Sequence, residues 1–368
     1  MNRRSLETAL EFAEKQCRRL VERDPAHHPM YSVGGKWKHD GEKWTHWCEG
    51  FYPGIFWLLH KQTGDAFWRT HAETASKRLE PRQHDRNVHD LGFLFFSTYL
   101  RWYNLTGDPA LREVLVTAGR TLALRREIGG YLRSFVAPES LFIDIMMNVG
   151  IILWAANATD DPCLRSIALE HCRTTAKTIV RPDGGTAHEG IFDLATGKFL
   201  RESTHQGYRP DSTWSRGQAW ALYGFTAVHR LSGCVEFLDV AKRCADCFLR
   251  RRGADPIPLW DFDAPRDRPQ PYDSSAAAIA ASGLLDLAEQ TPLVADRRRY
   301  RDAAHEMLDA LCTDKFLAIN TPGWEGILMH GVYHLHKNLG VDESVAWGDF
   351  FFVEALVKAL AGRSEAAW

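Results

Sequence analysis

The chain has 368 residues, 45% of them hydrophobic and 25% charged, a composition typical of a folded globular protein. Its 45 Lys and Arg residues nearly balance 47 Asp and Glu residues, and the formal net charge of −2 argues against nucleic acid or an anionic membrane as a partner. The amino-terminal stretch lacks the apolar core of a signal peptide, no run is long enough to span a membrane, and the eight cysteines are scattered, so we expect a cytoplasmic protein.

Two kinds of predicted helix alternate along the chain. One kind is amphipathic, with apolar residues at helical spacing and charged residues opposite, and this pattern covers 6–22, 71–80, 110–126, 163–180, 235–252, 276–290 and 298–312. The other kind is apolar on nearly every side, as in 50–61, 90–105, 143–156, 217–231 and 348–360. A helix without a polar face is expected to be buried all round.

Turn signals connect the predicted helices into a repeat of helical hairpins, at 63–68, 106–112, 159–165, 232–238 and 291–297. The chain length accommodates about six such hairpins. An open solenoid would also accommodate the repeat, but buried inner helices paired with amphipathic outer ones favour a closed double ring. We therefore predict an all-α protein, an (α/α)6 barrel, as a single domain over residues 1–368. Residues 184–201 predict a short β-hairpin with a Thr-Gly turn.

The loops that lead into the apolar helices carry the candidate chemistry. Asp90 and Asp144 each stand where such a helix is predicted to begin, and a buried carboxylate is costly unless it is paired, hydrogen-bonded or protonated. Capping of the helix N-terminus is the simplest explanation of both residues. Catalysis is the alternative, since two facing carboxylates are the usual acid/base device for glycosides, and a raised pKa lets one of them donate a proton near neutral pH.

Other site chemistries receive less support from the sequence. His84-Asp85, His89-Asp90 and His334-x-His336 offer metal ligands, but none has the spacing of a known metal motif. Nucleophile motifs such as G-x-S-x-G and nucleotide-binding fingerprints are absent from the sequence. We expect neither a metal nor a cofactor.

Seven motifs resemble those of glycoside hydrolase family 88, the unsaturated glucuronyl hydrolases, and the resemblance runs in consistent order from about residue 44 to the end of the chain. They are HDLGF (89–93), IDIMMN (143–148), THQGYRPDSTWSRGQAWALYGF (204–225), LWDFDAP (259–265), YDSSAAAIAASGLL (272–285), GVYH (331–334) and WGDFFFVEAL (347–356). The resemblance implies the (α/α)6 barrel and a hydrolase of polysaccharide degradation. Its substrates would be lyase-generated oligosaccharides with a C4=C5 double bond in the non-reducing-end uronic acid.

The resemblance also implies roles for individual residues. Asp144 would be the catalytic acid/base that protonates C4 and activates the water, and Asp90 the second essential carboxylate. His188 would contact the sugar. The residues that would hold the unsaturated uronate are Gln206, Arg216, Trp214, Trp220 and Tyr333, with Trp47 and Phe51 as aromatics of the first loop. Apart from the resemblance, we expect a monomer or weak homo-oligomer.

Two departures from the family bear on the substrate. The loop before Asp144 is short and has Phe135 where some members have Trp. The contact that this loop makes with the aglycone in those members is therefore not expected to be reproduced unchanged. Members that favour sulfated substrates carry a Ser-x-x-Ser-x-Lys loop after Gly-x-Tyr, whereas this chain has His334 to Leu339 there, so we expect weak dependence on sulfate. An unsaturated rhamnogalacturonyl hydrolase and a sugar epimerase, the latter using His188, His205 and His334, remain alternatives on the same barrel.

Overall fold

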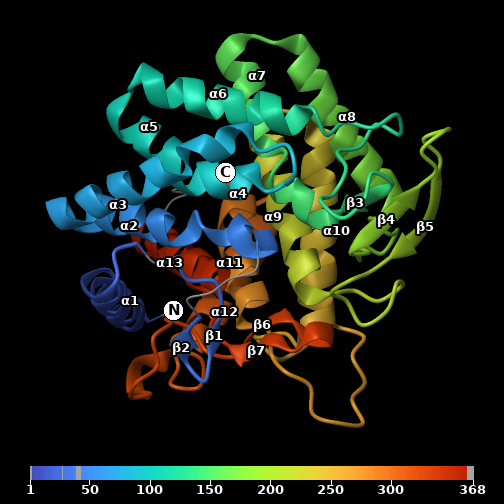
Figure 1. Cartoon of the computed structure of the whole chain (residues 1–368). Helices are drawn as coiled ribbons and strands as arrows, with labels where there is room; N and C mark the ends of the chain where they lie inside the picture. Colours follow the sequence, from blue (N-terminus) through green and yellow to red (C-terminus); the bar gives the residue numbers. More distant parts are fainter. Residues whose placement is uncertain (1, 27, 39–42, 363–368) are drawn as a thin grey trace.

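The computed structural model describes residues 2–26, 28–38 and 43–362, and in it pairs of antiparallel helices surround a common axis (Figure 1). Each predicted turn connects an inner helix to an outer one. The inner–outer pairs are α2 (Phe51–Thr63) with α3 (Ala66–Leu79), α4 (Leu91–Phe95), η3 (Phe96–Leu100) and α5 (Arg101–Thr106) with α6 (Pro109–Ala123), α7 (Gly150–Thr159) with α8 (Pro162–Thr178), α9 (Ser215–Ser232) with α10 (Val235–Arg252), and α11 (Ser274–Gln290) with α12 (Val294–Leu311).

The turns between paired helices form for local reasons. Gly64 and Gly107 end inner helices in the left-handed conformation, at φ 73° and 68°, where a residue without Cβ is not strained. Asp65, Asp108 and Asp161 then cap the outer helices by accepting backbone N–H bonds through their side chains. The hairpin repeat predicted from these turn signals is confirmed.

The ring is closed by helices from the two ends of the chain. The last inner helix, α13 (Ala346–Ala361), packs between α2 and α11, and its outer neighbour is α1 (Arg3–Arg23). Figure 1 shows α1 and α13 close together at opposite ends of the colour scale. An isolated β-bridge between Tyr31 and Val345 joins the same two regions. The closed (α/α)6 barrel predicted from the sequence is confirmed.

Two helix predictions were wrong in detail. Residues 276–290 were predicted to be amphipathic, but α11 is an inner helix that is buried from Ser274 to Ala288, because its Ala, Ser and Gly residues let neighbouring helices approach from every side. The predicted continuous helix over 90–105 is interrupted by the π-helical segment η3, where Ser97 and Thr98 donate hydroxyl hydrogen bonds to backbone carbonyl oxygens of the preceding turn.

A group of buried charges lies between α13, α11, α9 and α5, and we call Lys358, Glu354, Asp286 and Arg101 the closure cluster. The Lys358 ammonium is 3.0 Å from Asp286 and 3.2 Å from Glu354, and all three side chains are fully buried. Arg101 approaches Glu354 at 2.5 Å. Burial alone raises the pKa of Glu354, but the charges of Lys358 and Arg101 bring it down to about 2, so this carboxylate is held ionised.

Short strands fill the loops at the ends of the barrel. The predicted hairpin is confirmed as β4 (Glu189–Phe192) and β5 (Phe199–Ser203), which extend a sheet that begins with β3 (Ser140–Phe142) in the order β3-β4-β5. All pairs are antiparallel, with Leu141 opposite Gly190 and Gly190 opposite Glu202.

Two further two-stranded sheets, not predicted, consist of β1 (Ser32–Val33) with β2 (Lys36–Trp37) and β6 (Gly331–His334) with β7 (Leu339–Glu343). Short 3₁₀ segments are η1 (Lys43–Cys48), η2 (Glu80–His84), η4 (Ile143–Met147), η5 (Ala318–Asn320) and η6 (Leu335–Lys337).

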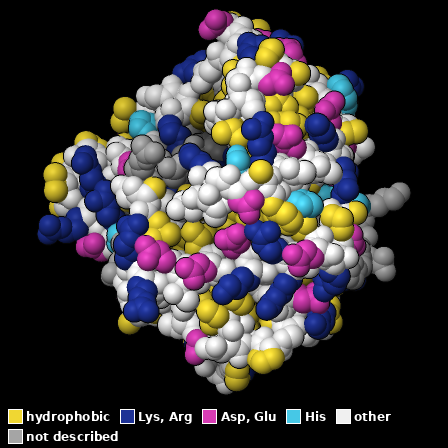
Figure 2. Space-filling model, turned by 90° about the vertical axis from the view of Figure 1, so that its left-hand side faces the viewer, with side chains coloured by type: hydrophobic (Ala, Val, Ile, Leu, Met, Phe, Trp, Pro, Cys, Tyr) yellow, Lys and Arg dark blue, Asp and Glu magenta, His cyan; other side chains and the backbone are white. Residues whose placement is uncertain are grey.

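The molecular surface reflects the balanced composition. Basic and acidic side chains are interspersed over the face shown in Figure 2. Among residues 2–26, 28–38 and 43–362, no helix combines the length and the hydropathy needed to cross a membrane.

The closure cluster generates a stability prediction. We expect Lys358→Met to lower the free energy of unfolding by about 3–5 kcal/mol, because it removes the central cation from two buried carboxylates. Chemical denaturation followed by circular dichroism measures this change. The matched control is Lys242→Met, since Lys242 pairs with Asp296 at the surface and its loss should cost less than about 1 kcal/mol. Equal effects of the two substitutions would contradict the prediction.

Candidate active site

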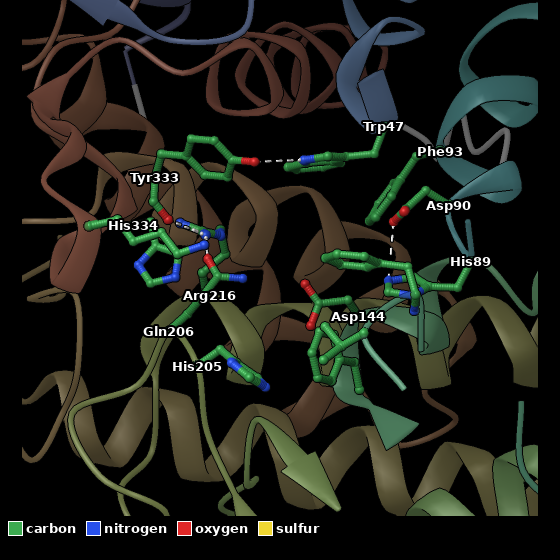
Figure 3. Close-up of a pocket in the computed structure, with 14 residues that line it drawn as sticks. Trp47, His89, Asp90, Phe93, Asp144, His205, Gln206, Arg216, Tyr333 and His334 are labelled. Carbon is green, nitrogen blue, oxygen red and sulfur yellow. Dashed lines mark hydrogen bonds and ion pairs between the residues drawn. The ribbon is translucent and has the colours of Figure 1, made fainter. Parts of the chain in front are cut away.

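A pocket of about 380 Å³ opens among the loops that lead into the inner helices. Six of the residues predicted from the sequence line it: Trp47, Asp90, Asp144, Gln206, Arg216 and Tyr333. Figure 3 shows Tyr333, His334, Arg216, Gln206 and His205 on one side, with Asp90, His89 and Phe93 on the other and Asp144 facing the space between.

Each of these residues precedes or begins an inner segment of the barrel. Asp90 immediately precedes α4, Asp144 lies in η4 just before α7, and Arg216 lies in the first turn of α9. Trp47 comes from η1 before α2, and Tyr333 comes from β6, in the connection that leads to α13. The expectation that loops entering the inner helices converge on one opening is confirmed for these side chains.

The position of Asp144 differs from the prediction. It lies in the first turn of the 3₁₀ segment η4, and the α-helix begins only at Gly150. Asp90 occupies the N-cap position of α4, yet its side chain accepts no capping hydrogen bond, and no side-chain cap is present at η4 or α7. Helix capping therefore does not explain either carboxylate.

Asn148 holds the segments of the two aspartates together. Its side-chain oxygen accepts a hydrogen bond from the Phe93 N–H at 2.8 Å, and its side-chain N–H donates to the Asp144 carbonyl oxygen at 3.2 Å. Gly92 permits this approach, because a Cβ at that position would lie 2.5 Å from the Asn148 Cα. The segments of Asp90 and Asp144 are thus held together by the Asn148 side chain and by the close backbone approach at Gly92.

Both carboxyl groups have raised pKa values. Burial raises the pKa of Asp90, the neighbouring Asp144 charge adds to the rise, Arg125 and Arg82 oppose it, and the result is about 8. Burial also raises the pKa of Asp144, whereas the Arg216 charge and the Trp220 indole lower it, and the result is about 6. Asp144 keeps 14% of its side chain exposed toward the pocket. Near neutral pH Asp90 is therefore protonated and Asp144 exchanges its proton readily.

The guanidinium of Arg216 is already engaged by the protein. It donates hydrogen bonds to the backbone carbonyl oxygens of Val332 and Tyr333 and, at 2.5 Å, to the Gln206 side-chain oxygen. It also lies 3.3 Å from the Asp273 carboxylate. Its flat face also lies over the Trp214 ring, 4.4 Å from the centroid. Arg216 thus supplies a buried positive charge and orients Gln206, whose amide N–H₂ group remains directed away from the guanidinium.

Four of the predicted site residues lie behind the pocket surface. Trp214 packs against His188 with ring centroids 4.9 Å apart, and Trp220 packs against Phe93 at 5.0 Å. Phe51 lies under Trp47, with their centroids 5.6 Å apart. His188 is buried, 3.7 Å from the Asp144 carboxylate. These side chains support the lining residues and do not themselves line the pocket.

Several lining residues were not assigned to the site from the sequence. His89 and Phe93 stand within HDLGF beside Asp90, so proximity in the chain was an available signal. Phe142 belongs to strand β3, which pairs with β4, and Val136 lies in the loop before that strand; the sequence carries no local sign that either enters the pocket. His205, His334 and Lys337 also line the pocket. His205 and His334 were predicted to act only in the epimerase alternative, and Lys337 was not assigned to the site. Within the described part of the chain, no three or more His, Cys, Asp and Glu side chains gather to hold a metal ion.

The raised pKa of Asp90 has a consequence for stability. Below pH about 4 the Asp90 carboxyl is protonated in both the folded and the unfolded chain. Between pH about 4 and about 8 only the folded chain retains this proton. The free energy of unfolding therefore falls as the pH rises through this range. We expect Asp90→Asn to be more stable than the wild type by several kcal/mol at pH 8.5 and nearly equal to it at pH 4, since each pKa unit corresponds to about 1.4 kcal/mol.

Denaturant unfolding of both proteins at the two pH values measures this difference. Asp211→Asn, at an exposed acid of the loop before α9, is the control and should show no such pH-dependent gain. A stability gain for Asp90→Asn that is the same at pH 4 and pH 8.5 would contradict the assignment of a protonated Asp90.

Comparison with known proteins agrees with this architecture. The chain is 34% identical over 329 residues to the unsaturated glucuronyl hydrolase of Bacillus sp. strain GL1, covering 86% of this chain and 87% of that protein. Its structure is similar to that of an unsaturated glucuronyl hydrolase specific for heparin, with a TM-score of 0.90, 31% identity, and 98% and 99% of the two chains covered.

A second solved structure shows a variant unsaturated glucuronyl hydrolase with dGlcA-Glc-Rha-Glc, at a TM-score of 0.90, 30% identity and 97% coverage of both chains. The sequence model of Glycosyl Hydrolase Family 88 matches residues 15–323, which extends the likeness upstream of the first motif recognised in the sequence. The ring of inner helices and the pocket at their entry loops, lined by Asp90 and Asp144, thus accompany a match over most of the sequence. The chain belongs to glycoside hydrolase family 88.

Proposed function

We propose that this glycoside hydrolase releases the 4,5-unsaturated uronic acid from the non-reducing end of lyase-generated oligosaccharides, by hydration of the C4=C5 enol ether. The observation that carries the proposal is the pair of carboxyl groups that line one pocket, the partly buried Asp144 and the buried Asp90, whose pKa values are raised to about 6 and about 8. Protonation of a vinylic carbon requires an acid that is still protonated near neutral pH.

The reaction proceeds through Asp144. Its carboxyl group donates a proton to C4, and the positive charge that develops at C5 is shared with the ring oxygen. The resulting carboxylate then accepts a proton from water as the water oxygen bonds to C5, which regenerates the acid. The hemiketal at C5 opens to a ketone, C1 becomes a hemiacetal, and the aglycone leaves as an alcohol. A pKa near the working pH suits a group that must both donate and accept a proton.

Asp90 complements this role because it is protonated when Asp144 is ionised. A protonated carboxyl can donate a hydrogen bond to a sugar hydroxyl or to the Asp144 carboxylate. Because the groups differ in pKa, the pocket can hold one mobile proton at Asp144 and one retained proton at Asp90.

The opposite side of the pocket suits the uronate carboxylate. Arg216 contributes a buried charge, and Lys337 also lines the pocket. Because the Arg216 donors are engaged by the protein, we propose that Gln206 makes the direct hydrogen bond to the substrate and that Arg216 acts through its charge and by orienting Gln206. His188, Trp214, Trp220 and Phe51 act from behind the surface, and Trp47 and Tyr333 offer an aromatic face to the sugar ring.

The central prediction concerns Asp144. Asp144→Asn should fold normally and lose about two to four orders of magnitude in kcat with an unsaturated disaccharide, because the amide can neither donate the proton to C4 nor accept one from water. Loss of the double-bond absorbance measures turnover. Asp211→Asn is the control and should keep the wild-type rate. Near-normal turnover of Asp144→Asn would contradict the assignment. A wild-type enzyme that hydrolyses an unsaturated rhamnogalacturonan disaccharide, but no unsaturated glucuronyl disaccharide, would favour the rhamnogalacturonyl hydrolase alternative.

The second prediction concerns sulfation. The loop from His334 to Leu339 lacks the two serines of sulfate-preferring members, and Lys337, although it lines the pocket, is an exposed side chain. An exposed ion pair contributes at most about 1 kcal/mol. We therefore expect kcat/KM for unsulfated and 6-sulfated unsaturated chondroitin disaccharides to agree within about tenfold. A preference for the sulfated substrate above this limit contradicts the expectation.

A further inference from the structure

Each of the two aspartates that line the pocket has a buried histidine beside it. The Nε2 atom of His89 is 3.3 Å from the Asp90 carboxylate, and the Nε2 atom of His188 is 3.7 Å from Asp144 Oδ2. Both imidazoles are 2% exposed. Neither distance corresponds to a closed hydrogen bond. Within the described residues His188 Nε2 and Asp144 Oδ2 have no other hydrogen-bond partner, and such contacts commonly tighten when substrate binds.

The other ring nitrogen of each histidine is occupied in the same way. His89 Nδ1 accepts the backbone N–H of Phe135 at 3.1 Å, and His188 Nδ1 accepts the backbone N–H of His205 at 3.0 Å. A backbone N–H is an obligatory donor, so the nitrogen that it faces carries no proton. The single N–H of a neutral imidazole is then on Nε2, which is the nitrogen that faces the carboxyl group.

Both imidazoles are neutral in the working range. Burial lowers the pKa of His188 to about 3, and burial with the nearby Arg125 charge lowers the pKa of His89 well below its usual value. A cationic imidazole would instead stabilise the ionised acid and strip it of its proton. The other charged and titratable groups that face these two pairs are Arg82, Arg125, Asp85 and His171 around His89 and Asp90, and Arg216, Glu189, His205 and His334 around His188 and Asp144.

We propose that His89 and His188 are positioning residues which present neutral N–H donors, fixed in the Nε2–H tautomer by backbone contacts, to Asp90 and Asp144 and take no part in proton transfer. The inference rests on the proposed function, because it assigns these histidines a task in that reaction. A neutral donor orients a carboxyl oxygen without supplying the positive charge that would ionise it. The locking N–H groups come from the loops before β3 and before α9, so the positions of these loops are coupled to the orientation of the acids.

His171 provides a matched control within the same protein. It is buried, its Nδ1 accepts the backbone N–H of Leu132 at 3.1 Å, and burial lowers its pKa to about 3. Its Nε2 atom, however, has no hydrogen-bond partner among the described residues. All three histidines are therefore buried, and in all three a backbone N–H contact to Nδ1 fixes the Nε2–H tautomer. They differ in whether the Nε2–H group faces a carboxyl group.

Kinetics of paired variants test the proposal. Methionine removes the N–H donor, whereas glutamine can keep an N–H near the Nε2 position. We expect His188→Met to lose about 10- to 100-fold in kcat/KM, with the alkaline limb of the pH profile moved to higher pH because the ionised form of Asp144 has lost a donor. His188→Gln should recover most of both changes, and His171→Met should keep the wild-type limb. Equal pH profiles for His188→Met and His188→Gln would overturn the proposal.

Nitrogen-15 NMR of histidine-labelled wild-type protein supplies a test that needs no substrate and uses the glutamine variants only to assign the signals. The signals of His89 and His188, identified by their disappearance in the glutamine variants, should show the neutral Nε2–H tautomer from pH 5 to pH 8. Titration of either ring in that range, or a proton on Nδ1, would overturn the proposal even in an enzyme with the proposed activity. Conversely, absence of hydrolysis of unsaturated disaccharides would refute the proposed function while the tautomers remain measurable.

Discussion

The closure of the helical ring is the constraint on which the rest of the structure depends. Helix α13 must pack between α2 and α11, although it lies at the other end of the chain from α2. Contacts across this seam include the Tyr52 hydroxyl, which donates to Asp349 at 2.8 Å, and the Trp47 indole N–H, which donates to Tyr333 at 3.2 Å. Such pairings bring a large loop-closure entropy cost, and burial of apolar surface along the inner helices offsets it.

The pocket exists because the seam is closed. One part of its lining comes from the first hairpin, through Trp47, and another from the last connection, through Tyr333, His334 and Lys337. Burial of Asp90 and Asp144 by the surrounding segments disfavours their charged forms and raises their pKa values. The packing that closes the ring thus also helps these acids to retain their protons. Burying two protonated or partly protonated acids in the pocket costs less free energy than burying two carboxylates would. The charges of the closure cluster lie outside the pocket, where Lys358 pairs directly with Asp286 and Glu354.

Much of the fold and part of the site could be predicted without coordinates. Apolar helices alternating with amphipathic ones, and the Gly-Asp turn signals between them, correctly predicted the hairpins, because both patterns report local geometry. The prediction failed for α11, whose small residues have no strong periodicity, and for Asp144, where a 3₁₀ turn and the Asn148 contact replace a helix start. Resemblance to a family named the candidate site residues, but did not distinguish those that line the pocket from Trp214, Trp220, Phe51 and His188, which lie behind it.

The sequence by itself determined the helices, their turns and the presence of acids in the loops that enter the inner ring, because these depend on residues near one another in the chain. Only the tertiary structure decided the state of those acids and their neighbours. The pKa of Asp90, the engagement of Arg216 with Val332 and Tyr333, and the tautomers of His89 and His188 all depend on contacts between segments far apart in sequence. A protonation state is set by what surrounds a group in space, and residue spacing along the chain does not contain that information.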